Sequence, residues 1–527
     1  MRSATAVGAA LLVAGCFGGS DAPNRRTLID SRDNYDPRSL DPALSTDVPT
    51  GRAVGYVFDG LTRFTPRAEV QPGLAERWDV SPDGRTYTFH LRHGVTFHDG
   101  TRFVARHVVS SWQRALDPKL KSGAGEFLYP IRGARELATG KASTLSGVTA
   151  PDDSTVVVTL EQPLASFVKL LAMPIASIVP EHAPADLGEH PIGTGPWKLV
   201  EWRHDDYLLF ARNEQYFLGP PKTESLQARI IAEPSTSVAE FESRTIDILQ
   251  IPAGQTREWE DDESRNQLLS STPALQLVYV GINTTRGALA DARVRQAINH
   301  AIDIGTIVER LVSGRGTRAA GVIPPALAGY DSTRRPYAFD PAKARQLLAA
   351  AGHPDGIDVD LWTSTTPIYV RIAETIQAYL NAVGIRTKVV QRESAASRAA
   401  ARKGETDMIL KDWYADYPDA ENFLYPLLHS ANKGAGGNVS FYANPRFDSL
   451  VTAVRHELDD AKRTALARAA DSIAFVDAPM VFLYFYNELY AVQPWVKGFT
   501  PPVIFNGQRW LDVELATGSR DSASANR

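Results

Sequence analysis

The sequence predicts an α/β protein with more than one domain. Its 527 residues are too many for one compact core, so two or three domains are expected. Residues 357–413 alternate strand and helix patterns, which predicts right-handed crossovers and a parallel sheet. A late aromatic run at 481–490 predicts a buried strand that returns the chain to an earlier domain, so we expect interleaved domains.

The first element is an N-terminal leader that ends at Cys16, the single cysteine of the chain. Arg2 precedes an apolar run at 4–14, which is shorter than the roughly 20 residues that span a bilayer. The small residues before Cys16 resemble the lipobox of bacterial lipoproteins, in which the cysteine is acylated. An ordinary signal peptide with an incidental cysteine is the alternative. We expect 1–15 to be a lipoprotein signal peptide and 16–24 a flexible tether.

Composition excludes several classes of protein. With a formal net charge of −5, the chain lacks the excess of basic residues that is typical of a nucleic-acid binder. No nucleic-acid partner is therefore expected. One cysteine cannot form a disulfide within the chain, so hydrophobic cores must stabilise it. The mature chain has no long apolar run after the leader, and its polar end at 516–527 is expected to be a flexible tail.

Strand patterns dominate the first half of the chain. In residues 86–91, Tyr87, Phe89 and Leu91 alternate with polar residues, which predicts a half-buried strand. Further strands are predicted at 155–160 and 275–281.

Helix signals follow. Asp291 can cap one helix in which apolar residues at helical spacing continue to Leu311, with Gly314 just beyond its end. Asp340 and Pro341 open a second helix that Gly352 closes.

The region 357–413 has the strongest pattern. We predict strands at 357–362, 385–390 and 407–413, separated by helices at 368–383 and 395–402. Ligands of open α/β sheets bind beyond the carboxyl ends of the strands. The segment 413–419 follows such an end and is therefore the first candidate site.

No catalytic constellation emerges. The three histidines at 90, 93 and 98 lack the further ligands of a closed metal site, and no G-x-S-x-G motif is present. Asp416 and Asp419 have no nearby base in the sequence, so a catalytic carboxylate pair is disfavoured. Capping of a turn and contact with a ligand remain equal alternatives for Asp416. We expect no enzyme activity, no catalytic or metal-binding residues and no cofactor.

An ordered set of short motifs resembles one protein family. Leu40-Asp41-Pro42-Ala43 is followed by Tyr56-Val57-Phe58-Asp59-Gly60-Leu61, Leu74-Ala75-Glu76-Arg77-Trp78, Phe97-His98-Asp99-Gly100-Thr101 and Gly193-Thr194-Gly195-Pro196-Trp197. Together they resemble the family 5 extracellular solute-binding proteins, the dipeptide, oligopeptide and nickel receptors of ABC importers. The resemblance covers essentially the whole mature chain.

The resemblance implies a two-lobed type II periplasmic-binding-protein fold of the α/β class with an additional inserted domain, the class called cluster C. Lobe I would comprise 25–45, 163–278 and 482–515, the extra domain 46–162, and lobe II 279–481. Chain crossings near Tyr279 and Tyr484 would form the hinge.

The resemblance also assigns ligand contacts. Peptide-binding members carry a Trp-x-x-Asp motif whose aspartate pairs with the α-ammonium of the ligand, and Trp413 to Asp416 match it. The expected ligand-binding residues are Asp416, Trp413, Tyr414, Ala415, Arg32 and Asn34. Oligopeptide receptors can carry an arginine that pairs with the ligand carboxylate, and Lys411 stands near that position. Whether Lys411 binds the ligand carboxylate is left open.

These features imply a monomeric, exported, lipid-anchored receptor that captures a small solute, a peptide by preference, and delivers it to an ABC transporter permease. An oligosaccharide or a metal chelate is the alternative ligand. An extracellular hydrolase or a structural lipoprotein is the remote alternative.

Overall fold

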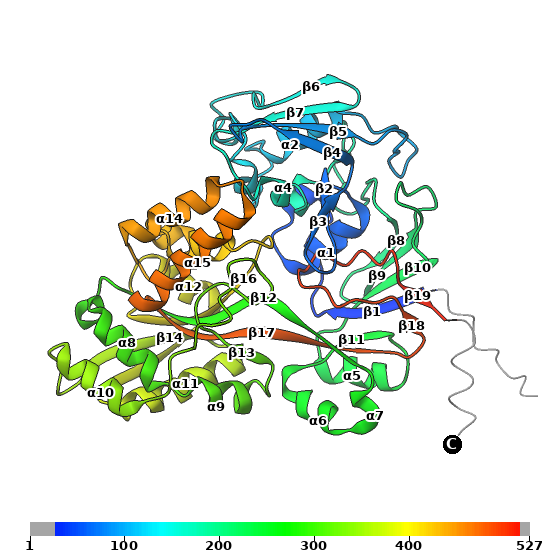
Figure 1. The fold of residues 1–527 in the computed structure, drawn as a ribbon. Helices are drawn as coiled ribbons and strands as arrows, with labels where there is room; N and C mark the ends of the chain where they lie inside the picture. Colours follow the sequence, from blue (N-terminus) through cyan, green and yellow to red (C-terminus); the bar gives the residue numbers. More distant parts are fainter. Residues whose placement is uncertain (1–26, 517–527) are drawn as a thin grey trace, which may run out of the picture.

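The structure, a computed structural model, describes residues 27–516. Its main feature is an eleven-stranded mixed sheet that runs through both halves of the molecule (Figure 1). In spatial order its strands are β15 (Ile385–Arg392), β14 (Ile357–Ser364), β16 (Met408–Tyr414), β12 (Leu269–Ile282), β17 (Met480–Val492), β11 (Ile248–Gln250), β1 (Thr27–Asp33), β10 (Ser225–Ile230), β9 (Tyr207–Arg212) and β8 (Trp197–Arg203), with β13 (Gly316–Arg318) paired to β17.

Two long strands, β12 and β17, connect the halves (Figure 1). They pair antiparallel, and the register shifts between Pro273 and Leu277 and again between Val278 and Tyr279. Tyr279 and Tyr484, where the crossings are predicted, lie on these strands at the second shift. The late aromatic strand is therefore confirmed, and it pairs with β11, β12 and β13.

The alternating region is confirmed as strand, helix, strand, helix, strand. Helices α11 (Pro367–Asn381) and α12 (Ser394–Arg402) connect β14, β15 and β16, and both pairings of β14 are parallel. The predicted parallel sheet ends at β16, because β16 pairs antiparallel with β12.

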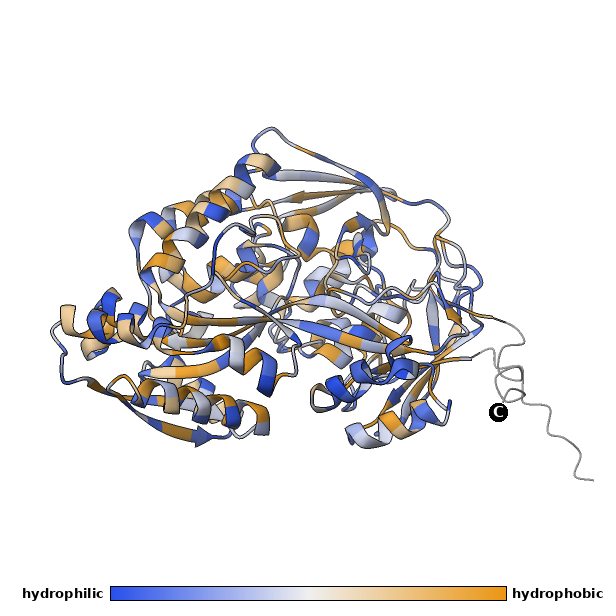
Figure 2. Ribbon diagram, turned by 60° about the horizontal axis from the view of Figure 1, so that its bottom comes forward, coloured by the Kyte–Doolittle hydropathy of each residue, from blue (hydrophilic) through white to orange (hydrophobic). Residues whose placement is uncertain are grey.

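Two hydrophobic cores cover the faces of this half of the sheet. One core includes α8 (Ala292–Ala301), α10 (Pro341–Ala350) and α11, and the other includes α13 (Glu421–Leu428), α14 (Pro445–His456) and α15 (Asp460–Asp477). Figure 2 shows hydrophobic and hydrophilic residues side by side on these helices, as expected for helices with one buried face.

The helix predicted from Asp291 to Leu311 is wrong as one element. Helix α8 ends at Ala301, and Ile302 has extended backbone angles. Asp303 then caps the short helix α9 (Ile304–Thr306) by accepting a hydrogen bond from the Thr306 amide at 3.1 Å. A π-helical turn follows at Ile307–Leu311. The local cap therefore interrupts the apolar spacing that suggested one helix.

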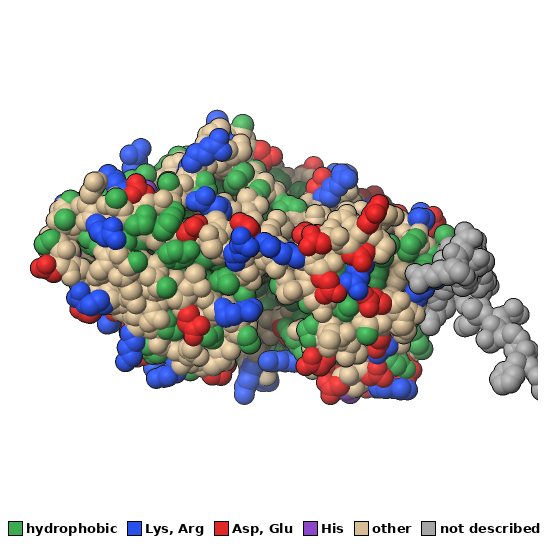
Figure 3. All heavy atoms as spheres, turned by 90° about the horizontal axis from the view of Figure 1, so that it is seen from below, with side chains coloured by type: hydrophobic (Ala, Val, Ile, Leu, Met, Phe, Trp, Pro, Cys, Tyr) green, Lys and Arg blue, Asp and Glu red, His purple; other side chains and the backbone are tan. Residues whose placement is uncertain are grey.

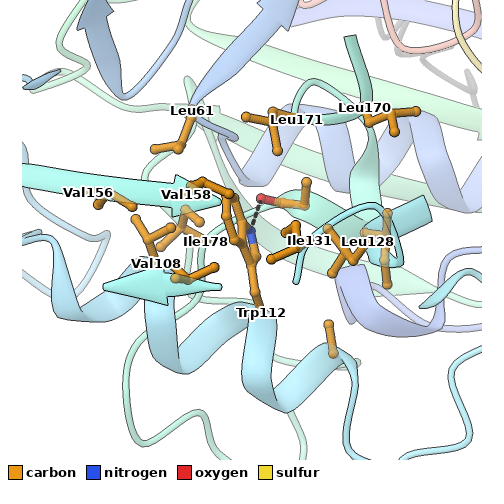
Figure 4. Close-up of a cluster of buried hydrophobic side chains, with 14 of the residues drawn as sticks. Leu61, Val108, Trp112, Leu128, Ile131, Val156, Val158, Leu170, Leu171 and Ile178 are labelled. Atoms are coloured by element: carbon orange, nitrogen blue, oxygen red, sulfur yellow. Dashed lines mark hydrogen bonds between the residues drawn. The ribbon is translucent and has the colours of Figure 1, made fainter. Parts of the chain in front are cut away.

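A second sheet has its own core. It contains β4 (Ala75–Val80), β5 (Thr86–Leu91), β7 (Thr155–Thr159) and β6 (Val148–Asp152), and helix α2 (Arg106–Ala115) packs beside it. Trp112 lies at the centre of this core, where its Nε1 donates to the Ala176 carbonyl at 3.0 Å (Figure 4). Leu128 and Ile131 pack beside Trp112 and anchor the 3-10 turn Gly125–Leu128.

The remaining elements are short. They are α1 (Val48–Val57), β2 (Thr62–Phe64), β3 (Val70–Pro72), α3 (Ala134–Ala138), α4 (Phe167–Leu170), α5 (Pro234–Glu242), α6 (Thr256–Asp261), α7 (Glu263–Asn266), β18 (Val496–Lys497) and β19 (Glu514–Leu515). Among residues 27–516, no helix has the length and apolar character to cross a membrane.

Candidate ligand-binding site

Two neighbouring cavities meet the loop that follows β16, and a third cavity lies next to the second. The first cavity, about 480 Å³, is lined by residues of 126–135, 161–170, 413–436 and 455–456. The second, about 330 Å³, is lined by residues of 45–48, 123–127, 173–175 and 413–416 and by Phe505. The third, about 360 Å³, is lined by residues of 31–35, 48–52, 231–237 and 250–253 and by Arg315 and Tyr486. Shared lining residues place the cavities in a row, and Figure 3 shows the molecule hollowed between its two halves.

Asp416 lies where the first and second cavities meet. Asn422 holds it from two sides: the Asp416 amide donates to Asn422 Oδ1 at 2.9 Å, and Asn422 Nδ2 donates to Asp416 Oδ2 at 3.2 Å. Burial raises the pKa of Asp416 to about 6, and the nearby carboxylate of Glu126 adds to the rise. Within the described part of the chain, Asp416 forms no ion pair with a lysine or arginine. A ligand cation would therefore relieve an uncompensated charge.

Trp413, Tyr414 and Ala415 lie beside Asp416, as predicted. Trp413 lines the first and second cavities, and its buried indole N–H has no hydrogen-bond partner in residues 27–516. Tyr414 lines the second cavity, and burial raises the pKa of its phenol. The Ala415 amide donates to the Leu275 carbonyl at 2.8 Å. Because the amides of Ala415 and Asp416 already have acceptors, neither is free to donate to a ligand backbone.

Arg32 and Asn34 lie in the third cavity, apart from Asp416. The side chain of Arg32 is fully buried, where Nε donates to both carboxylate oxygens of Asp30 at 2.9 Å and Nη2 to the Tyr56 hydroxyl at 3.2 Å. Its guanidinium also lies 4.7 Å from the Trp510 ring centroid. The guanidinium is therefore part of the interior, and the Arg32 carbonyl accepts a hydrogen bond from Arg52 Nη1 at 3.2 Å. Asn34 is exposed.

Two other residues of interest lie elsewhere. Lys411 lines none of the three cavities, and burial lowers its pKa to about 8 beside Arg402 and Arg398 on α12. Cys16 lies outside the described residues.

Several polar residues near the site were not predicted. Asp419, expected only as one half of a disfavoured catalytic carboxylate pair, lies between Lys169 Nζ at 2.6 Å and Arg463 Nη2 at 2.5 Å. Asn422 and Glu126 are the other two. No local motif marks these residues, and Glu126 and Lys169 come from distant parts of the sequence. Residues 27–516 contain no group of three His, Cys, Asp or Glu side chains arranged to hold a metal ion.

A mixed α/β sheet that passes through two halves, with a row of cavities between them, defines a type II periplasmic binding protein. Residues 69–435 match the family described as bacterial extracellular solute-binding proteins, family 5 middle. The chain belongs to this family, whose members are solute-binding receptors of ABC importers.

Similar proteins align with this chain over nearly its full length. Heme-binding protein A of Haemophilus influenzae is 30% identical, covering 94% of this chain and 95% of its own. The dipeptide-binding protein of Escherichia coli is 31% identical, covering 88% and 90%. A periplasmic ABC-transporter-associated binding protein from Helicobacter pylori, solved with the peptide STSA, is 29% identical with a TM-score of 0.76, covering 93% and 98%. All three are named as binding proteins, which fits a role other than catalysis.

Proposed function

We propose that this receptor binds a peptide whose free α-ammonium pairs with Asp416. The observation that carries the proposal is a carboxylate at the junction of two cavities, held by Asn422 and without a cationic partner among the described residues. A charge-assisted bond in such a partly dry site is stronger than one in water. The dipeptide-binding relative and the peptide complex of the Helicobacter pylori protein support this ligand class.

Peptide binding can be tested by titrating the purified protein with short peptides and their N-acetylated counterparts. Acetylation, or Asp416→Asn, is expected to weaken binding by about 2–5 kcal/mol, as loss of one partner of a buried charge pair does. Asp358→Asn is the matched control, because this exposed carboxylate lines none of the three cavities. Equal binding of acetylated and free-amine peptides would contradict the proposal.

The proposal extends to transport. The lobes would keep the ranges expected from the sequence, and β12 and β17 would carry the hinge on which they close around the ligand. The closed form would dock on a membrane permease. Acylated Cys16 and residues 16–24 would tether the receptor near that permease.

A metal chelate is the second candidate ligand, because one relative is named as a heme-binding protein. Titration with hemin, followed by its visible absorbance, separates the two candidates. Tight hemin binding that is unaffected by Asp416→Asn would favour the chelate over the peptide.

A further inference from the structure

The first cavity has an excess of negative charge. Its lining includes four carboxylates and two guanidinium groups, namely those of Glu126, Glu161, Asp416, Glu421, Arg135 and Arg455. Both arginines are already engaged: Arg455 lies 3.0 Å from Glu421 and 3.8 Å from the Tyr425 ring centroid, and Arg135 lies 4.6 Å from the Tyr129 ring centroid. Burial lowers the pKa of His456, so this imidazole is neutral at pH 7 and adds no positive charge.

Glu126 contributes to this excess without a partner of its own. Its carboxylate forms no ion pair or hydrogen bond with any residue in 27–516, yet Glu126 lines the first and second cavities together with Asp416. The two like charges are close enough that Glu126 adds to the rise in the pKa of Asp416. One ligand ammonium at Asp416 would therefore leave a second carboxylate uncompensated at the same end of the site.

The backbone of Glu126 is anchored by its neighbours, while the residue itself is exposed. It belongs to the 3-10 turn Gly125–Leu128, and Leu128 is fully buried beside Trp112 (Figure 4). The hydrophobic core thus anchors the 3-10 turn at Leu128, two residues after Glu126. Aromatic rings of Phe127, Tyr129, Trp413 and Tyr425 line the same cavity. Such rings pack well against the methylene stem of a long basic side chain and attract its cation.

We propose that Glu126 is a specificity residue and that the first cavity accepts a lysine or arginine side chain at the first position of the ligand. The α-ammonium then pairs with Asp416 and the side-chain cation with Glu126. This inference rests on the proposed peptide function and names the class of peptide: one that carries two positive charges at its N-terminal residue. The cavity volume of about 480 Å³ lies within the range typical of ligand pockets.

The test compares tripeptides that differ only at the first residue: Lys-Ala-Ala, norleucine-Ala-Ala and Glu-Ala-Ala. The lysine peptide is expected to bind about three- to tenfold more tightly than the norleucine peptide, and the glutamate peptide more weakly than both. Glu126→Gln is expected to remove the preference for lysine, so that the affinity ratio of Lys-Ala-Ala to norleucine-Ala-Ala falls close to one. Glu136→Gln is the matched control, since Glu136 is exposed on the neighbouring helix α3 and lines none of the three cavities.

Two results would overturn the inference: equal affinity of the lysine and norleucine peptides, or an equal loss of both in Glu126→Gln. The same peptides in N-acetylated form separate this failure from failure of the proposed function. If acetylation weakens binding while the first side chain has no effect, only the Glu126 subsite is wrong. If acetylation has no effect, the role of Asp416 itself is wrong.

Discussion

The ammonium of Lys169 lies 2.6 Å from Oδ2 of Asp419, a residue 250 positions later in the chain. Lys169 belongs to α4, beside the core around Trp112, whereas Asp419 lies in the loop after β16, next to the candidate site. Burial alone would raise the pKa of Asp419, but Lys169 and Arg463 together lower it to about 2. The pair therefore fixes the loop that carries Asp416 against a separate part of the molecule.

Replacing Lys169 by methionine is expected to destabilise the protein by about 1–3 kcal/mol at pH 7, less than the full loss for a broken buried pair because Arg463 remains. Urea unfolding measures the effect. Arg386→Met is the matched control and is expected to cause no measurable change, because its pair with Asp358 is exposed. Because the pKa of Asp419 is lower in the folded state, its contribution is present above about pH 4 and is lost as the pH falls toward 2. Equal urea midpoints for Lys169→Met and Arg386→Met would contradict the stabilising role of Lys169.

Arg32 is expected to affect stability and not ligand choice. Arg32→Met leaves the carboxylate of Asp30 buried without its cation, which typically costs about 3–5 kcal/mol. Urea unfolding should show the loss, and the double variant with Asp30→Asn should recover part of it. Arg38→Met is an exposed control from the same segment. A normal unfolding midpoint with altered peptide preference would contradict the interior role of Arg32.

The sequence was most informative where local signals agree. The strands and helices of 357–413 were predicted closely because Gly384 and the polar residues between elements mark their ends. The direction of β12 relative to β16 was not predictable, since strand pairing depends on the path of the chain and not on local pattern. The helix predicted from Asp291 to Leu311 was wrong for a local reason. Asp303 caps a new helix, and this cap interrupts an apolar spacing that continues across it.

The candidate site divides in the same way. Trp413 to Asp416 were found because they follow a strand end and match a short motif. Arg32 was expected to be a ligand-binding residue, and nothing in the sequence shows that Asp30 and Trp510 enclose its guanidinium. Glu126 could not be found, because tertiary packing alone brings it to Asp416.

Loss of Cys16 is expected to change location without changing affinity. Cys16→Ala removes the thiol that would be acylated, so the protein should leave the membrane fraction and appear in the soluble exported fraction. The tether affects local concentration near a permease and not the binding site, so peptide affinity should be unchanged. Cell fractionation and titration of the released protein check both statements. Ser20→Ala, in the expected tether, should stay with the membrane. Retention of Cys16→Ala at the membrane would contradict lipid anchoring.

The raised pKa of Asp416 predicts two opposite pH effects. In the ligand-free protein, the folded state holds a proton on Asp416 up to about pH 6, while the unfolded chain releases it near pH 4. Stability should therefore fall as the pH rises from about 4 to 6, by about 1–3 kcal/mol from this group. Peptide binding should change in the other direction, because only the ionised carboxylate attracts the ligand ammonium.

Affinity is expected to be about tenfold weaker at pH 5 than at pH 7, since protonation of a group with a pKa near 6 removes most of the carboxylate at the lower pH. The ligand ammonium stays protonated across this range, so it does not offset the change. Titration calorimetry at pH 5, 6 and 7 measures the effect. In Asp416→Asn both the affinity and the free energy of unfolding should depend less on pH, because the amide does not titrate. Any pH dependence that remains belongs to other groups. A wild-type affinity that is constant from pH 5 to 7 would show that the ligand does not bind through the charge of Asp416.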